Sequence, residues 1–339
     1  MPTILIVMIA LAIVFDFLNG IHDSSNIVAT MISSRAFSPR VALGVTALTE
    51  FLGPFIFGVA VATTIGDEIV TASAITLNIL IAALTSAIIW NIITWFLGIP
   101  SSSSHALIGG LIGAVGIGAG FDAIELRGME KILIALFTSP IIGLILGYLI
   151  TKLVYFLARG ATPKINWFFK RSQIITGIAL ALSHGTNDSQ KTMGIITLGL
   201  VTAGVIPTFH VPLWVITASA SAIALGTALG GWKLIKTLGS KFYKIRPVHG
   251  FSAQLTSALV ILGASLVGGP VSTTQVVSSS IMGVGSAERV SKVRWGVAKE
   301  IVVAWIITIP ATALMAAGLI YLIDNGAAIS AFFCNLFFC

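Results

Sequence analysis

Ten apolar segments constrain this chain more than any other feature, because most of them approach the length of a membrane crossing. A helix needs about 20 mainly apolar residues to cross the hydrocarbon core of a bilayer. Only 9% of the 339 residues are charged, whereas about 25% is usual in a soluble domain. This composition excludes a soluble enzyme, a disordered chain and a nucleic-acid-binding protein, and it predicts an all-α polytopic protein of the lipid bilayer. The expected segments are residues 3–33, 41–65, 75–98, 104–120, 131–157, 173–205, 211–232, 250–267, 275–286 and 300–323.

Basic residues are concentrated in alternate loops between these segments. Loops rich in Lys and Arg stay in the cytoplasm, so a multi-pass protein of the cell (inner or plasma) membrane with both termini outside is expected. The bias also explains most of the net charge of +7, although a basic face for anionic lipid or a partner is compatible with it. The residues assigned to the cytoplasmic side are Arg35, Arg40, Lys152, Arg159, Lys164, Lys170, Arg171, Lys233, Lys236, Lys241, Lys244, Arg246, Arg289, Lys292, Arg294 and Lys299.

The two cysteines, Cys334 and Cys339, lie at the C-terminal end of the sequence. A single pair at this spacing predicts neither a metal site nor a disulfide framework. The first residues lack the basic region and the cleavage site of a signal peptide.

Three sequence blocks occur twice, in the same order and 165 to 171 residues apart. The pairs are Asn19–Asn26 with His184–Lys191, Leu84–Ala87 with Leu255–Ala258, and Gly98–His105 with Gly268–Gln275. By the charge pattern the first copy starts outside and the second starts inside, which predicts two inverted-topology repeats with broken helices. This design is typical of transporters with a binding site near the midplane, whereas plain duplication without transport is the alternative. We expect repeats at 1–160 and 173–325, a basic cytoplasmic linker at 161–172, and a short apolar tail at 326–339.

Polar residues follow one face of the first expected helix at steps of three and four. These residues are Asp16, Asn19, Asp23, Asn26, Thr30 and Ser33. A carboxylate at membrane depth is costly unless it is paired or wetted. The stripe therefore predicts a polar path, with Asp16 facing a vestibule.

Asp23 and Asp188 occupy equivalent positions in the two repeats. Together with Asn26 and Asn187 they offer oxygen ligands for a small cation, and we expect Na⁺ there. The glycines that precede them in each motif are expected to loosen the helices and expose carbonyl groups. A structural ion pair between Asp188 and Lys191 is the alternative. The histidines of the two motifs, His22 and His184, are expected to serve packing or hydrogen bonding.

The third repeated block places a proline and a hydroxyl cluster between an apolar helix and a short one. Such a break predicts a re-entrant hairpin in each repeat, with Ser or Thr capping the second arm. The start of a helix offers free N–H groups and a partial positive charge, which suits an anion without any Lys or Arg. The two hairpins would hold one oxyanion from opposite sides, and nearby cations would offset its repulsion from the aspartates.

These motifs resemble those of the inorganic phosphate transporter family (PiT, the solute carrier 20 class). The segment from His184 to Gly194 is similar to the prokaryotic form of the family motif, whereas His22 replaces a common asparagine and Gln275 replaces a histidine. The resemblance implies phosphate uptake driven by Na⁺ or protons, a transport-coupling role for Glu50 and no cofactor.

The leading hypothesis is thus a secondary active Na⁺-driven symporter of inorganic phosphate, with alternating access around a site between the repeats. An H⁺-coupled phosphate or sulfate permease is the alternative, and a passive anion channel is less favoured. An intramembrane hydrolase that uses Ser104, His105 and a distant aspartate is strongly disfavoured, because adjacent Ser104 and His105 do not face each other as nucleophile and base. A homodimer is left open. The residues assigned to phosphate are Ser102, Ser103, Ser104, His105, Ser272, Thr273, Thr274, Gln275, Lys191 and Thr192.

Overall fold

The computed structural model of the protein describes residues 2–70, 74–232, 235 and 245–338, with side chains described as far as residue 326. These residues form helices and turns, and their only β-type pairing is an isolated bridge between Val70 and Ile124. Several residues singled out from the sequence lie outside the described side chains: Lys233, Lys236, Lys241, Lys244, Cys334 and Cys339.

Helices account for the apolar segments. Among the described residues, six helices are long and apolar enough to cross a membrane. They are α1 (Thr3–Ser33), α2 (Pro39–Phe57), α4 (Leu77–Leu97), α6 (Leu126–Leu157), α10 (Pro247–Leu266) and α12 (Trp295–Phe338). The predicted all-helical, polytopic fold is therefore confirmed. The remaining α-helices are α3 (Ala60–Thr63), α5 (Ser103–Gly118), α7 (Ile165–Thr202), α8 (Leu213–Leu229) and α11 (Thr273–Glu288).

The helix α7 begins earlier than its apolar segment suggested. The apolar segment was expected to begin at residue 173 because Lys170 and Arg171 precede it. The helix nevertheless continues through these two residues and starts at Ile165. Long basic side chains tolerate this position because their charged ends can extend towards the polar interface.

Two short helices, α5 and α11, begin at the breaks predicted from Pro100 and Pro270. Each has 16 residues, which corresponds to about 24 Å of helix. The hydrocarbon core is about 30 Å thick, so neither helix crosses it fully. The Ser/Thr hairpins consist of α4 with α5 and of α10 with α11.

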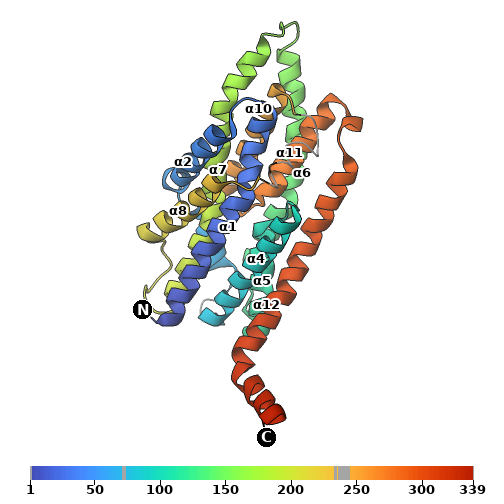
Figure 1. Cartoon of the computed structure of the whole chain (residues 1–339). Helices are drawn as coiled ribbons and strands as arrows, with labels where there is room; N and C mark the ends of the chain where they lie inside the picture. Colours follow the sequence, from blue (N-terminus) through green and yellow to red (C-terminus); the bar gives the residue numbers. More distant parts are fainter. Residues whose placement is uncertain (1, 71–73, 233–234, 236–244, 339) are drawn as a thin grey trace.

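The two halves of the chain exchange helices in a symmetric way. The helix α5 of the first half packs against α12 of the second half. Correspondingly, α11 of the second half packs against α6 of the first half. Likewise α1 contacts α8, and α7 contacts α2. Figure 1 shows α11 above α5, with the two helices on opposite sides of the centre. This exchange is the arrangement expected of two inverted repeats.

Both chain ends lie at the bottom of Figure 1, whereas the connection between α6 and α7 lies at the top. The turn that follows α1 also lies in the upper half. These two connections, in which basic residues were expected, are thus at the end of the molecule opposite to the termini.

The motif glycines do not loosen their helices, so this expectation was wrong. Both α1 and α7 continue as regular helices through Gly20 and Gly185. A Cβ added at Gly20 would lie 2.1 Å from the carbonyl oxygen of Ile223, and one at Gly185 would lie 2.2 Å from that of Glu50. The glycines therefore let α1 approach α8 and α7 approach α2.

Candidate functional site

The N-terminal ends of the two short helices meet at the centre of the molecule. Ser102 accepts a hydrogen bond from the amide of His105 at 3.1 Å, and Ser272 accepts one from the amide of Gln275 at 3.3 Å. The Gln275 side chain lies 2.9 Å from Nδ1 of His105, joining the two tips. Ser102 and Ser272 are thus N-caps that hold the helix starts, as their residue type favours.

The carboxylate of Asp23, on α1, lies against the tip of α11. Its Oδ1 accepts hydrogen bonds from the Thr274 hydroxyl at 2.8 Å and from Nδ2 of Asn26 at 2.9 Å. Its Oδ2 lies 3.4 Å from the hydroxyls of Ser103 and Thr273. Both hairpins therefore contact this carboxylate, and Asp23 and Asn26 lie side by side as predicted.

The carboxylate of Asp188, on α7, contacts the same tip from the other side. Its Oδ1 pairs with Lys191, and its Oδ2 accepts a hydrogen bond from the Thr273 hydroxyl at 2.8 Å. Thr273 consequently lies between the two aspartates. The ion pair kept as an alternative is present, but Lys191 also donates to Ser104 at 2.5 Å and to the carbonyl of Val271 at 2.8 Å.

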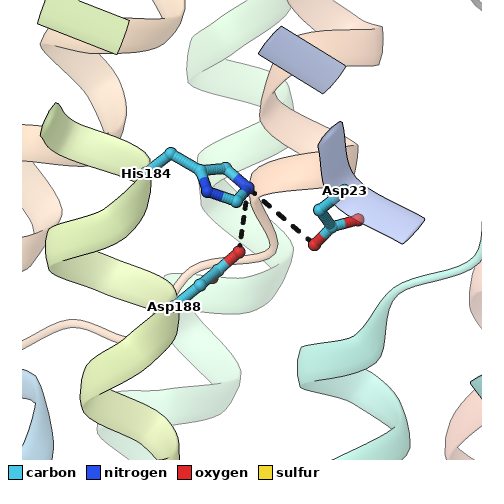
Figure 2. A group of neighbouring side chains, drawn as sticks. All are labelled: Asp23, His184 and Asp188. Carbon is cyan, nitrogen blue, oxygen red and sulfur yellow. Dashed lines mark ion pairs between the residues drawn. The ribbon is translucent and has the colours of Figure 1, made fainter. Parts of the chain in front are cut away.

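His184 lies between the acidic groups, a position that its residue type alone did not predict. Its Nε2 is 3.1 Å from Asp188 and 3.9 Å from Asp23, and its Nδ1 is 2.7 Å from Oε1 of Glu50. Figure 2 shows the imidazole of His184 directed between the two aspartates. One ligand atom from each of Asp23, His184 and Asp188 lies within 4.8 Å of the others, all three buried. The spacing of four residues between His184 and Asp188 was the available signal.

Two residues of the predicted set point elsewhere. Asn187 binds the α10–α11 connection: its side chain donates to Ser265 and to the Gly269 carbonyl, and its Oδ1 accepts the amide of Val271 at 3.2 Å. Thr192 donates to Asp16 at 2.6 Å, and no hydrogen bond of the described residues links its hydroxyl to a hairpin.

Asp16 does not face a vestibule, so that expectation was wrong. Its side chain is fully buried between α1 and α7. The polar stripe of α1 is covered by neighbouring helices because α1 lies inside the bundle, which periodicity alone cannot reveal.

The two halves of the site differ in chemistry. Gly20 and Gly185 make equivalent contacts with Ile223 and Glu50, so those two residues occupy corresponding positions. The motif alignment likewise pairs Asn19 with His184. The pair of His184 (α7) and Glu50 (α2) is therefore matched at the related position by an uncharged pair, Asn19 (α1) and Ile223 (α8).

Every residue of this cluster is buried, with at most 3% of its surface exposed. Two cavities lie beside the hairpins. One, of about 720 Å³, lies between α6 and α10 and reaches Val271. The other, of about 520 Å³, lies between α4 and α12 and reaches Pro100. Since the clustered side chains are buried, a solute reaches them only when helices or hairpins move.

The geometry combines two kinds of binding group. Paired carboxylates with adjacent hydroxyl and amide oxygens suit a cation, and two opposed helix starts suit an anion. A profile of the family described as the phosphate transporter family matches residues 19–316. The chain belongs to this family.

The family is shown also by individual relatives. The chain is 47% identical to a probable low-affinity inorganic phosphate transporter of Bacillus subtilis, over 93% of this chain and 95% of that protein. It is 45% identical to a protein of the same description from Rhizobium meliloti, with the same shares covered. The fold is similar to a solved structure described as the sodium-dependent phosphate transporter, with a TM-score of 0.85, 25% identity, and 95% and 99% of the two chains covered. The resemblance of the motifs to the phosphate transporter family is thus confirmed.

Proposed function

We propose that this protein is a Na⁺-driven symporter that imports inorganic phosphate by alternating access to the buried site. The observation that carries the proposal is the position of Thr273, at the tip of α11 and between the carboxylates of Asp23 and Asp188. A group that binds the anion therefore touches both groups that bind the cation. Family membership supports phosphate as the solute.

Competition for the same oxygen atoms supports obligatory coupling. The Thr273 and Thr274 hydroxyls donate their hydrogens to the aspartates. A cation coordinated by those carboxylates takes the acceptor oxygens, which frees the hydroxyls to donate to phosphate. The cation also offsets the repulsion between phosphate and the aspartates, which is strong where water is excluded.

Na⁺ fits the donor set because the available ligands are oxygens that need no change of protonation. The Oδ1 atom of Asn26 is buried and has no hydrogen-bond partner among the described residues, so it is free for a cation. The corresponding Oδ1 of Asn187 accepts an amide hydrogen bond instead. We therefore assign Asp23, Asn26 and Asp188 as Na⁺ ligands. Asn187 remains a proposed ligand, but its side chain can bind Na⁺ only after its hydrogen bonds to the α10–α11 connection break.

Phosphate would be held by the helix starts rather than by a basic side chain alone. The amides of Ser103, Ser104, Thr273 and Thr274 belong to first turns, where helix geometry provides no intrahelical acceptor. Lys191 adds a positive charge at the same place, since it touches Ser104. His105 and Gln275 complete the set at the contact between the tips.

The test is uptake of radiolabelled phosphate by liposomes that contain the purified protein. With an inward Na⁺ gradient we expect concentrative uptake, and with an equal K⁺ gradient we expect none. Asp23→Asn and Asp188→Asn should each reduce Na⁺-driven uptake by at least roughly tenfold, a loss equivalent to about 1.4 kcal/mol, while inserting normally. Near-normal uptake by both variants would contradict the assignment of the cation ligands.

Proton coupling is the second candidate, favoured by the contact between His184 and Glu50. Uptake driven by a pH gradient in the absence of Na⁺, and abolished by a protonophore, would select it. Competition by excess sulfate identifies a sulfate permease, and equilibration without accumulation identifies a channel.

A further inference from the structure

A second buried carboxylate lies outside the cluster described above. Asp16, on α1, is fully buried, and its Oδ1 accepts a hydrogen bond from Thr192 of α7 at 2.6 Å. Its Oδ2 is also buried and has no hydrogen-bond partner among the described residues. The mechanism proposed above makes no use of this group.

Neutral oxygen donors surround the carboxylate. The buried hydroxyl of Ser219, on α8, faces Asp16 as a potential hydrogen-bond donor to its carboxylate. The side-chain oxygen of Asn19, about one turn further along the same face of α1, is buried and unpartnered among the described residues. Hydroxyl groups of α7 and α8 thus lie against this carboxylate of α1, and each hydroxyl oxygen has spare acceptor capacity.

The carboxyl group of Asp16 has no ion-pair partner among the described residues. The ion pairs formed by the described residues include Asp23, Glu50 and Asp188 but do not include Asp16. An unpaired charge inside a membrane protein is costly. One negative charge with neutral oxygen ligands matches a monovalent cation, whereas a divalent ion would retain excess charge.

This carboxylate makes no ion pair or hydrogen bond with Asp23 or Asp188 among the described residues, although it lies within electrostatic reach of Asp188 and Lys191 on α7. Asp16 precedes Asp23 by two helical turns, about 10 Å along α1, on the side of the chain termini. A cation bound there would lie on the terminal side of Asp23.

The second repeat lacks an equivalent of this group. The alignment that pairs the motifs, and the helix contacts that pair α2 with α8, match Asp16, Thr192 and Ser219 with Ala181, Ile27 and Thr46. Only Thr46 retains a hydroxyl, and it is equally buried. The feature is therefore single, and Thr46 provides a matched control for Ser219.

We propose that Asp16, Thr192 and Ser219 form an additional Na⁺ site beside the central aspartates. This site rests on the Na⁺ coupling proposed above, and it adds one bound ion on the terminal side only.

The experiment counts bound ²²Na⁺ ions per chain in the purified, full-length protein at saturating Na⁺. Asp16→Asn should bind one ion fewer than the unmodified protein, because it removes the charge without changing the volume. Thr192→Val and Ser219→Ala should weaken Na⁺ binding by up to roughly tenfold, as expected for the loss of one ligand hydrogen-bonding group. Thr46→Ala should leave both the number and the affinity of bound ions unchanged.

The outcomes separate this site from the central one. If the unmodified protein binds Na⁺ but Asp16→Asn binds the same number of ions with the same affinity, the additional site is refuted and the symporter proposal stands. If the unmodified protein binds no Na⁺, both proposals fail. If Thr46→Ala weakens binding as much as Ser219→Ala, the effect is general to the bundle and the site is refuted. Thr192→Val and Ser219→Ala decide the matter should Asp16→Asn fail to fold.

Discussion

At the scale of single residues, Lys191 joins three parts of the site. Its ammonium group pairs with Asp188 and donates to the Ser104 hydroxyl and to the Val271 carbonyl. It thereby connects α7 to both hairpins. Because an ammonium group has three donor hydrogens, these three acceptors satisfy it completely.

Replacing Lys191 should therefore destabilise the protein as well as impair transport. Lys191→Met leaves Asp188 buried without its cation, a change that costs about 3–5 kcal/mol. Unfolding followed in detergent should show this loss, and the double variant Lys191→Met with Asp188→Asn should recover part of it.

The matched control is Lys292→Met. Like Lys191, Lys292 pairs with an acidic residue close to it in the sequence, Glu288, but the Lys292 side chain is 43% exposed. Exposed pairs contribute at most about 1 kcal/mol, so this variant should unfold like the parent protein. Equal losses of stability in the two variants would show that the buried ion pair contributes no more to folding than the exposed one.

The sequence predicted the type of residue at the site better than the orientation of each side chain. Equivalence of the repeats identified Asp23 and Asp188, and helical spacing placed Asn26 beside Asp23. The same reasoning could not show that Asn187 faces the α10–α11 connection, because spacing defines a face of a helix but not the neighbour it meets. For the same reason, the contact of His184 with Glu50 on α2 was not foreseen.

At the scale of helices, the crossing points at Gly20 and Gly185 determine how closely the repeats pack. We predict that Gly20→Ala and Gly185→Ala lower thermal stability and phosphate uptake, since the added Cβ would lie 2.1 and 2.2 Å from backbone oxygens. Overpacking of this kind costs about 1–3 kcal/mol or more. Thermal unfolding of the purified variants measures the effect.

The control for these variants is Gly44→Ala, at a helical position of α2 with no atom within 4 Å of the added Cβ. Alanine is the better helix former by about 1 kcal/mol, so this variant should be as stable as the parent protein or more stable. A destabilised Gly44→Ala would point to a general intolerance of the bundle instead of close approach.

The helix start of α5 gives a separate prediction. Ser104→Ala removes one hydroxyl, whereas Ser104→Pro also removes an amide donor at a first-turn position where proline fits sterically. If the amides hold phosphate, the proline variant should show the larger rise in the phosphate concentration required for half-maximal uptake. Equal, small effects of both variants would count against the helix start as the anion site.

Helix positions followed from the sequence where apolar runs were long, as in α1 and α4. The predicted start of α7 was wrong, because apolar residues mark the part of a helix that lies in lipid and not its full length. The hairpins were predictable because proline and capping serines interrupt the chain at matched positions. The unbroken course of α1 and α7 was not, since a glycine can serve close packing as readily as flexibility.

At the scale of the whole molecule, the arrangement of the ends makes the membrane orientation testable. Replacing Cys334 and Cys339 with serine provides a background for single engineered cysteines. Asp122→Cys and Ala161→Cys are at exposed positions of opposite connections. An impermeant maleimide applied to intact cells should label the first, and should label the second only after permeabilisation. The reverse pattern would contradict the orientation inferred from the basic loops.

The exchange of α5 and α11 between the halves gives the protein an internal two-fold design, yet the chemistry at its centre does not obey it. His184 of the second repeat pairs with Glu50 of the first, whereas Asn19 of the first repeat and Ile223 of the second stand at the positions related to these two by the two-fold axis. A rearrangement that swaps the roles of the halves therefore ends in a state of different free energy. Under the alternating access proposed above, the unloaded protein would therefore rest towards one compartment even without voltage or gradient, and its maximal rates of import and export would differ.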